Sequence, residues 1–161
     1  MNTIFSIFLR AAIIALICFC IGSGSNFIRA WQLPWLYIPP NEITISGHKI
    51  PFCTADEAEK WLDDPQTVFI DTRHEKDYAA GHVRGAIFLS PENKEQRFPG
   101  IEPLVPQGSK LILYCYGPDC DMAETVAAFL IDLGHSHLMI MSDGYPGWEQ
   151  KGLPIEQSNG R

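Results

Sequence analysis

Short, wholly apolar runs recur through most of the chain. They cover residues 68–70, 86–89, 111–114 and 138–141. A strand with one face in water alternates apolar and polar residues, whereas a strand buried on both faces of a sheet is apolar throughout. The pattern therefore predicts four buried strands.

Polar residues at capping positions predict two longer helices. One begins at Thr54 and ends before Pro65, and the other begins at Asp121 and ends at Gly134. Each first residue is followed three positions later by a glutamate, which is the spacing of a capping box. Apolar residues then recur at helical spacing in both segments.

Less regular sequence separates these elements. A short helix is predicted around residues 78–79 and ended by Gly81, whereas residues 91–109, which are rich in proline, are predicted to be a loop with at most one helical turn. Strands that alternate with helices predict an α/β fold, in which a parallel sheet carries helices on both faces. Functional groups in such a sheet lie beyond the carboxyl ends of its strands.

The amino-terminal segment is a separate unit. Residues 11–21 are uncharged and apolar; this run is shorter than the roughly 20 residues of a transmembrane helix and has the length of a signal-peptide core. Because the chain stays uncharged to Ile28, and because Trp31 and Trp35 follow as interfacial aromatic residues would, we favour a retained anchor over a cleaved signal. A buried core helix is the third interpretation.

The chain thus divides into an anchor or signal at residues 1–30, a linker rich in proline and aromatic residues at 31–42, and a domain at 43–157. Arg10 precedes the apolar run, which weakly favours an amino terminus on the inner side. We expect a single-pass protein of the cell membrane whose domain faces the periplasm or the cell exterior. The alternative is secretion to the periplasm after signal cleavage.

Charge and cysteine content narrow the function. Twelve basic against 19 acidic residues give a net charge of −7, which argues against a nucleic-acid partner. Five cysteines are too few and too unevenly placed for a disulfide scaffold. Two of them lie in the apolar run, which leaves Cys53, Cys115 and Cys120 for chemistry, and we expect Cys53 to be structural.

Polar or reactive residues follow three of the predicted strands. They are Asp71, Cys115 and the segment 142–144. The loop at 115–121 joins a strand to a helix, and its backbone N–H groups and the helix amino terminus favour a thiolate. Cys115 is therefore a candidate nucleophile, although a small apolar residue ending a buried strand is an equal alternative.

Several ordered motifs then resemble those of rhodanese domains. They are residues 70–73 with Tyr78, the segment Gly81–Ile87, the strand and cysteine loop at 111–121, and Gly144–Trp148 with 152–154. The resemblance covers about residues 43–157. It implies a rhodanese-like sulfurtransferase in which Cys115 carries sulfane sulfur as a persulfide, with a sulfur donor and a thiol acceptor, such as a protein, as partners. It implies no cofactor and no metal.

The same resemblance assigns supporting residues. Asp71 and Arg73 match a pair that holds the site together, and we expect a structural ion pair. His82 precedes a tight turn and is expected to hydrogen-bond it, while Trp148 is expected to pack in the core.

Two features depart from the family pattern. The distance from Cys115 to Gly134 is two residues longer than in the commonest single-domain members, and the loop lacks the usual Arg or Lys. Its residues are Tyr116, Gly117, Pro118, Asp119, Cys120 and Asp121. Carboxylates there would repel thiosulfate or phosphate and raise the pKa of Cys115. The departure argues against a phosphatase and against efficient use of free thiosulfate.

Cys120 adds a second possibility. It lies five positions after Cys115, so the two sulfur atoms could close a disulfide in an oxidising compartment, with Cys120 as a resolving thiol. The spacing is not that of a zinc site. The alternatives to a sulfurtransferase are therefore a thiol–disulfide redox relay and a non-catalytic binding module of the membrane surface.

Overall fold

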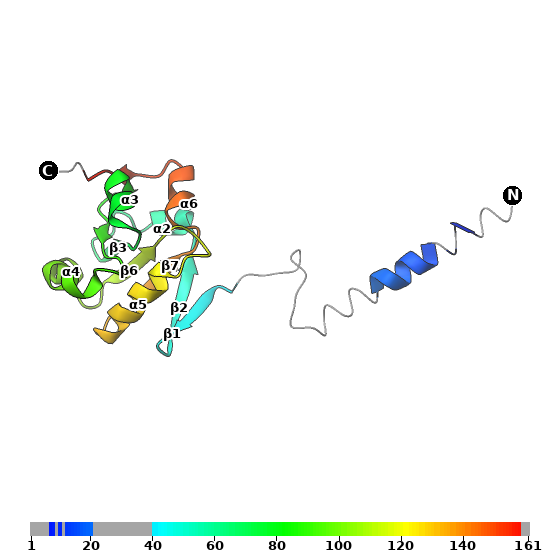
Figure 1. Cartoon of the computed structure of the whole chain (residues 1–161), viewed down its shortest axis with the longest axis horizontal. Coiled ribbons are helices and arrows are strands. Elements are labelled where there is room, and N and C mark those ends of the chain that lie inside the picture. The colour runs from blue at the N-terminus through cyan, green and yellow to red at the C-terminus, as the bar shows by residue number, and fades with distance from the viewer. Residues whose placement is uncertain (1–6, 9, 11, 21–39, 159–161) are drawn as a thin grey trace. The chain divides into compact units, whose positions relative to one another are not determined.

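The computed structural model of the chain describes residues 7–8, 10, 12–20 and 40–158 (Figure 1). The chain divides into two compact units, Met1–Pro39 and Pro40–Arg161. Residues 12–20 are helical. Among the described residues, no helix combines the length and the apolar character that crossing a membrane requires. The predicted anchor beyond residue 20 and the linker up to residue 39 lie outside the described residues.

A six-stranded sheet forms the centre of the second unit, in the order β1-β2-β7-β6-β3-β5. All neighbouring strands run parallel except the first pair, which is antiparallel. The strands are β1 (Glu42–Ile45), β2 (His48–Cys53), β3 (Thr67–Asp71), β5 (Ile87–Phe88), β6 (Lys110–Tyr114) and β7 (Leu138–Met141). The four predicted strands are confirmed as β3, β5, β6 and β7.

Strands β1 and β2 were not predicted. They form a hairpin around Ser46 and Gly47, both of which have positive φ angles, and β1 is half exposed at the sheet edge. The sheet is therefore mostly parallel rather than wholly parallel. A separate two-stranded sheet pairs β4 (His82–Val83) with β8 (Ile155–Glu156).

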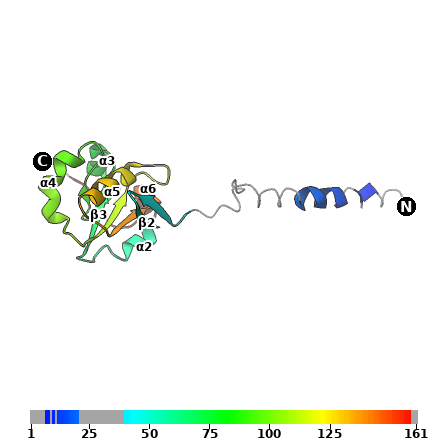
Figure 2. The same ribbon diagram turned by 90° about the horizontal axis from the view of Figure 1, so that it is seen from below.

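Helices cover both faces of the main sheet, as predicted (Figures 1 and 2). Residues of α4 (Lys94–Ile101) and α5 (Met122–Asp132) pack in one apolar core. Residues of α2 (Ala55–Glu59) and α6 (Gly144–Gln150) pack in the other. The remaining helices are α3 (Glu75–Ala80) and the 3-10 turn η2 (Glu102–Leu104).

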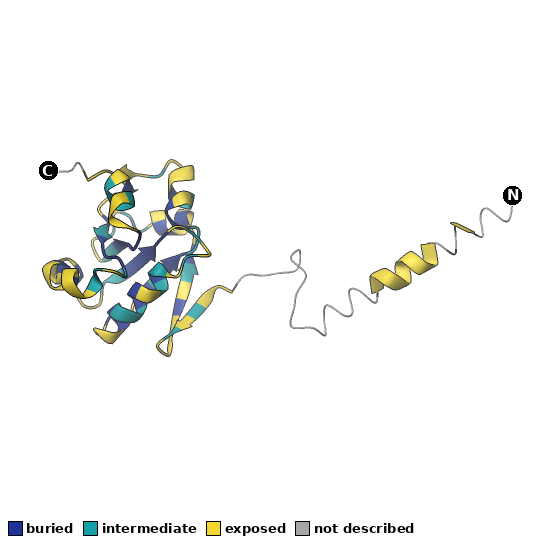
Figure 3. Ribbon diagram, viewed as in Figure 1, coloured by how far each residue is buried: buried dark blue, intermediate teal, exposed yellow. Residues whose placement is uncertain are grey.

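Strand β6 shows why its sequence has no polar alternation. Leu111 and Leu113 belong to the core under α5, whereas Ile112 and Tyr114 belong to the core on the other face. Successive side chains of a strand point to opposite faces, and all four are fully buried. Figure 3 shows the middle of the sheet in the colour of buried residues. The loop that follows β6 therefore starts from a buried strand in the middle of the sheet.

The helix boundaries test the predicted caps. Thr54 and Glu57 form the expected capping box, but α2 ends at Glu59, so the predicted continuation to Pro65 is wrong. At the start of α5, however, the Asp121 side chain makes no capping hydrogen bond, so the capping box predicted there is wrong. Gly134 closes α5 as predicted: its N–H and that of His135 donate to carbonyls of the last turn, the arrangement of a Schellman motif.

The prediction of a loop over residues 91–109 is also wrong in part. Residues 94–101 form α4, which contains Pro99, and η2 follows directly. Phe98 and Ile101 are buried against α5 and β6. Burial of this apolar pair stabilises a helix that its own proline and glycine content disfavours.

His135 is buried beyond the end of α5, and its ring meets that of Phe98 edge-on. Within the described part of the chain, its Nδ1 atom has no hydrogen-bond partner. Burial lowers the pKa of His135, an effect that the charge of Glu102 partly opposes. The folded domain therefore holds this imidazole neutral.

We expect the domain to lose stability as the pH falls below about 6.5, the ordinary pKa of histidine, because the unfolded chain then binds a proton that the buried ring resists. The midpoint of urea unfolding at pH 7.5 and at pH 5.5 measures this loss. His135→Leu should make the two midpoints more alike, whereas replacing the exposed His48 by Gln should not. Equal pH dependence in all three chains would contradict this role of His135.

Candidate functional site

Cys115 follows the carboxyl end of β6, on the side of the sheet where its parallel strands end and where sites of α/β folds lie. Its side chain reaches into the core under α5 and is only 3% exposed. The structure joins it to the half-buried Cys120 in a disulfide, with the two Cα atoms 6.4 Å apart. The loop thus brings together the two cysteines singled out from the sequence.

The Cys115 sulfur faces carbonyl oxygens of its own loop. Its Sγ lies 3.3 Å from the Cys120 oxygen and 3.9 Å from the Gly117 oxygen. Carbonyl oxygens do not stabilise a thiolate, whereas N–H donors do. In the disulfide form, the loop therefore does not have the arrangement that would stabilise a Cys115 thiolate.

The segment after β7 forms the wall behind the loop. The Tyr145 N–H donates to the Cys115 carbonyl at 2.8 Å. Gly144 has a φ of +59°, and a Cβ atom there would lie 2.5 Å from the Cys115 oxygen and 2.6 Å from the Gly117 nitrogen. Only glycine fits at this position, so the motif at 144–148 supports the loop directly. The sequence placed residues 142–144 at this edge but did not assign Gly144 or Tyr145 this role.

Asp143 contacts α2, whereas the neighbouring Gly144 contacts the loop. Its carboxylate accepts hydrogen bonds from the Ala55 N–H at 3.0 and 3.1 Å. This contact ties the start of α2 to the end of β7. Asp143 therefore positions a helix.

Tyr116 connects the loop to α3. It is 39% exposed, its hydroxyl donates to the Asp77 carboxylate at 2.5 Å, and it accepts from the His74 N–H at 3.2 Å. Burial and the hydrogen bond to Asp77 raise the pKa of Tyr116, so the hydroxyl keeps its proton. Sequence reasoning missed Asp77 and His74, because their contact with Tyr116 exists only in the folded chain.

Asp71 and Arg73 form a buried ion pair. Arg73 Nε lies 3.0 Å from Asp71 Oδ1 and Nη2 lies 2.7 Å from Oδ2, while Arg73 is only 4% exposed. Its Nη2 also donates to the Gly81 carbonyl, and the guanidinium carbon lies 3.8 Å from the centre of the Tyr145 ring. Burial would lower the pKa of Arg73, but the pair with Asp71 raises it. The charge of Arg73 is thus matched within the protein.

His82 and Trp148 lie further from the sulfur. His82 is buried, its ring stacks on Tyr78, and its Nδ1 lies 2.8 Å from the Tyr78 carbonyl oxygen. His82 therefore contacts the last turn of α3. The hydrogen bond expected from His82 to the tight turn that follows it in the sequence is not the one observed. Trp148 is fully buried, packs edge-on against Phe69, and donates from its indole N–H to the Pro154 carbonyl.

The loop that contains Cys115 is acidic. Asp119 and Asp121 are exposed, and Asp77 lies beside Tyr116. No Lys or Arg stands between residues 115 and 121, and the nearby Arg73 is paired. The loop thus carries two exposed carboxylates and no free positive charge.

Cys53 contrasts with the loop cysteines. It ends β2, is buried in the second core, and is a free thiol. Burial, followed by the charges of Glu57 and Asp143, raises the pKa of Cys53 to about 12. A thiol of this kind is inert at neutral pH, which agrees with the expected structural role.

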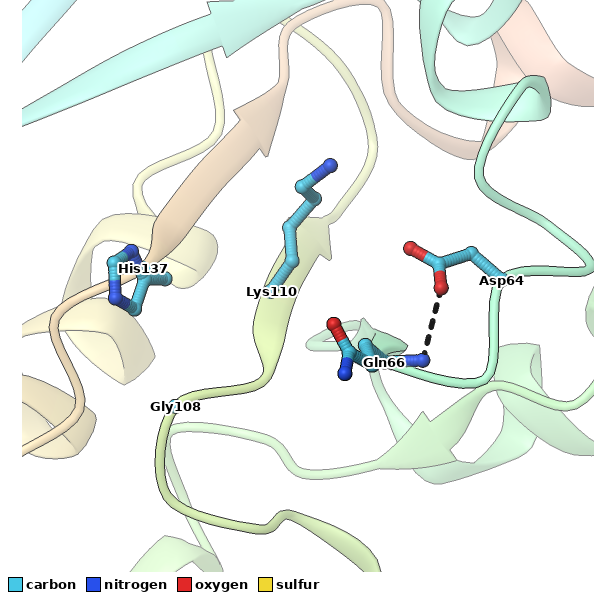
Figure 4. Close-up of a pocket in the computed structure, with 5 residues that line it drawn as sticks. All are labelled: Asp64, Gln66, Gly108, Lys110 and His137. Carbon is cyan, nitrogen blue, oxygen red and sulfur yellow. Dashed lines mark hydrogen bonds between the residues drawn. The ribbon is translucent and has the colours of Figure 1, made fainter.

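The described residues show no metal site, and they line a pocket away from the loop. No group of three or more His, Cys, Asp or Glu among them is arranged to hold a metal ion. The pocket, lined by Asp64, Gln66, Gly108, Lys110 and His137, lies where β3, β6 and β7 begin (Figure 4). Because these strands are parallel, it occupies the sheet edge opposite to Cys115.

The sequence of the chain is similar to those of known proteins. Residues 54–151 match the model of the rhodanese-like domain. The tRNA uridine(34) hydroxylase of Yersinia enterocolitica is 26% identical over 116 residues, which cover 68% of this chain and 32% of that protein. The chain thus spans about a third of the length of the curated relatives it matches.

Solved structures share the fold. The rhodanese-like domain of an Anabaena protein is similar with a TM-score of 0.55 at 21% identity, over 69% of this chain and 83% of that one. A thiosulfate sulfurtransferase from Pseudomonas aeruginosa is similar with a TM-score of 0.55 at 20% identity, over 81% of this chain and 22% of that one.

Proposed function

The chain belongs to the rhodanese-like domain family, and we propose that it is a sulfurtransferase with Cys115 as its nucleophile. The observation that carries the proposal is the position of Cys115, directly after the central strand and at the start of the loop that leads into α5. Its thiolate would attack the sulfane sulfur of a donor, form Cys115 persulfide, and release the rest of the donor with the electron pair. A thiol or another nucleophile would then accept the sulfur. No cofactor is needed for these steps.

The disulfide sets a condition on this activity. A sulfur atom bonded to Cys120 has no thiolate to offer. We therefore expect the oxidised chain to be inactive and the reduced chain, freed of reductant, to take sulfane sulfur from a donor and release the rest of that donor. Equal activity in both forms would contradict the assignment of Cys115.

The acidic residues of the loop support a donor that is not a small anion. Asp119 and Asp121 would repel thiosulfate, and Arg73 is held by Asp71. We propose that a neutral persulfide or a persulfide on a protein is the better donor, and that the acceptor is a thiol. The curated relatives carry tRNA in their name, but the net charge of −7 argues against RNA as a partner of this chain.

Replacing Asp119 by Arg should improve the use of thiosulfate. The change exchanges a repelling charge for one that grips an oxyanion, and we expect kcat/KM for thiosulfate to rise by about tenfold. Asp132→Arg is the matched control, because Asp132 is an exposed acidic residue at the other end of α5. An equal gain in both variants would reduce the effect to net charge, and no gain would mean that Asp119 points away from the donor.

We also propose that the apolar segment at residues 11–21 holds the chain at the cell membrane, with the domain facing the periplasm or the exterior. Support comes from its uncharged sequence and from the exposure of its apolar side chains in the helical residues 12–20. The full chain should stay with membranes through a carbonate wash, and protease should reach the domain from outside. A product released from the membrane that begins near Ser25 would indicate a cleaved signal instead.

A second candidate function is a thiol–disulfide relay that uses Cys115 and Cys120. The disulfide between them favours it. A reversible equilibrium with a dithiol, together with electron transfer to a protein disulfide but no sulfur transfer, would select the relay.

A further inference from the structure

We propose that Cys120 is a resolving thiol that releases the sulfane sulfur of the Cys115 persulfide as hydrosulfide, so that the domain reduces sulfane sulfur as well as carrying it. The inference rests on the proposed persulfide at Cys115. It identifies the product, hydrosulfide, and the residue that determines it.

The first support is the bond itself. The structure joins the two Sγ atoms directly, with the loop between them closed by a hydrogen bond from the Cys120 N–H to the Gly117 carbonyl. The folded loop therefore accommodates the product of an attack by Cys120 on the Cys115 sulfur. No helix or strand boundary lies between the two residues.

The second support is access. Cys115 is buried at 3% exposure, whereas Cys120 is half-buried. A donor has to reach Cys115 once for each sulfur, but an external acceptor would have to enter the same buried position again. A thiol five residues away is present at a high effective concentration at all times. The internal thiol therefore has the advantage over an external one.

The step balances as follows. The Cys120 thiolate attacks Sγ of Cys115, the bond between this Sγ and the sulfane sulfur breaks, and the sulfane sulfur leaves with the electron pair as hydrosulfide, keeping its proton. The two cysteines are oxidised to the disulfide while the sulfane sulfur is reduced. A dithiol reductant, small or protein-borne, then restores both thiols for the next cycle.

The test is a single turnover of the full chain. The chain is reduced, freed of reductant without oxygen, and mixed with one equivalent of an alkyl persulfide. Captured hydrosulfide is counted, and peptide mass mapping locates sulfur and disulfide. We expect one hydrosulfide per chain and a bond between Cys115 and Cys120. The Cys115→Ser chain, which keeps every other thiol, sets the background.

Variants separate this inference from the proposed function. Cys120→Ser and Cys120→Ala should keep an extra sulfur on Cys115 and release hydrosulfide at least about tenfold more slowly, while Cys53→Ser should behave as wild type. A wild-type chain that holds the persulfide as stably as Cys120→Ser, or that moves the sulfur to Cys120 without hydrosulfide, would overturn the inference and leave the sulfurtransferase intact. Failure of both Cys120 variants to load sulfur would overturn both.

Discussion

Replacing Cys115 by serine should abolish the uptake of sulfur from a sulfane donor by the reduced chain, with a loss of about a thousandfold or more. Serine has nearly the same shape, so the loop and the hydrogen bond from the Tyr145 N–H to the backbone can remain. Its hydroxyl cannot form a persulfide. The measurement is the initial rate at which the reduced chain consumes a neutral sulfane donor.

Cys53→Ser is the control for this result. Cys53 is a buried free thiol in the same domain, and its raised pKa keeps it protonated. This variant should keep most of the wild-type rate. Equal losses in the two variants, with native circular dichroism in both, would contradict the assignment of the nucleophile to Cys115.

The largest effect on stability is expected from Arg73→Leu. The change leaves the carboxylate of Asp71 buried without its partner, and the loss of one member of a buried pair costs about 3–5 kcal/mol. It also removes the donor to the Gly81 carbonyl and the contact with the Tyr145 ring. Chemical denaturation at neutral pH measures the free energy of unfolding.

Two control variants test whether the loss of stability in Arg73→Leu comes from the buried ion pair. The ion pair between Arg84 and Asp63 is exposed, so Arg84→Leu should cost at most about 1 kcal/mol. The double variant Asp71→Asn with Arg73→Leu should recover part of the loss, because no charge is then left unpaired. Equal losses for Arg73→Leu and Arg84→Leu would show that the buried pair contributes no more to the free energy of unfolding than the exposed pair does.

The interior of the fold was predictable from the sequence for a physical reason. Strands β3, β5, β6 and β7 are buried on both faces or nearly so, and this requirement leaves uninterrupted apolar runs. The capping box at Thr54 and the glycine at 134 act within one turn of chain, so they too are visible in the sequence.

The remaining elements depend on contacts that local sequence does not encode. The hairpin of β1 and β2 is partly exposed, and its pairing with β7 places it in the sheet. Helix α4 contains Pro99 and exists because Phe98 and Ile101 are buried. Asp121 lies at a capping position, yet its side chain does not cap the helix.

Of the candidate site, too, one part could be predicted from the local sequence and another part could not. Cys115 could be singled out because a strand, a glycine-proline loop and a helix follow one another in sequence. Its wall at Gly144 and Tyr145 comes from a distant segment. Spacing alone left the bond between Cys115 and Cys120 open, because five residues of loop allow many separations of the two sulfur atoms; the fold determines which one occurs.

The location of loaded sulfur tests the central claim most directly. The reduced Cys120→Ser chain, in which the persulfide cannot be resolved internally, is treated with an alkyl persulfide and mapped by peptide mass before and after cyanide. We predict one added sulfur atom on the peptide that contains Cys115, and its complete removal by cyanide. Sulfur on Cys53, or no added sulfur on any cysteine of a chain that remains folded, would contradict the proposal that Cys115 carries the persulfide.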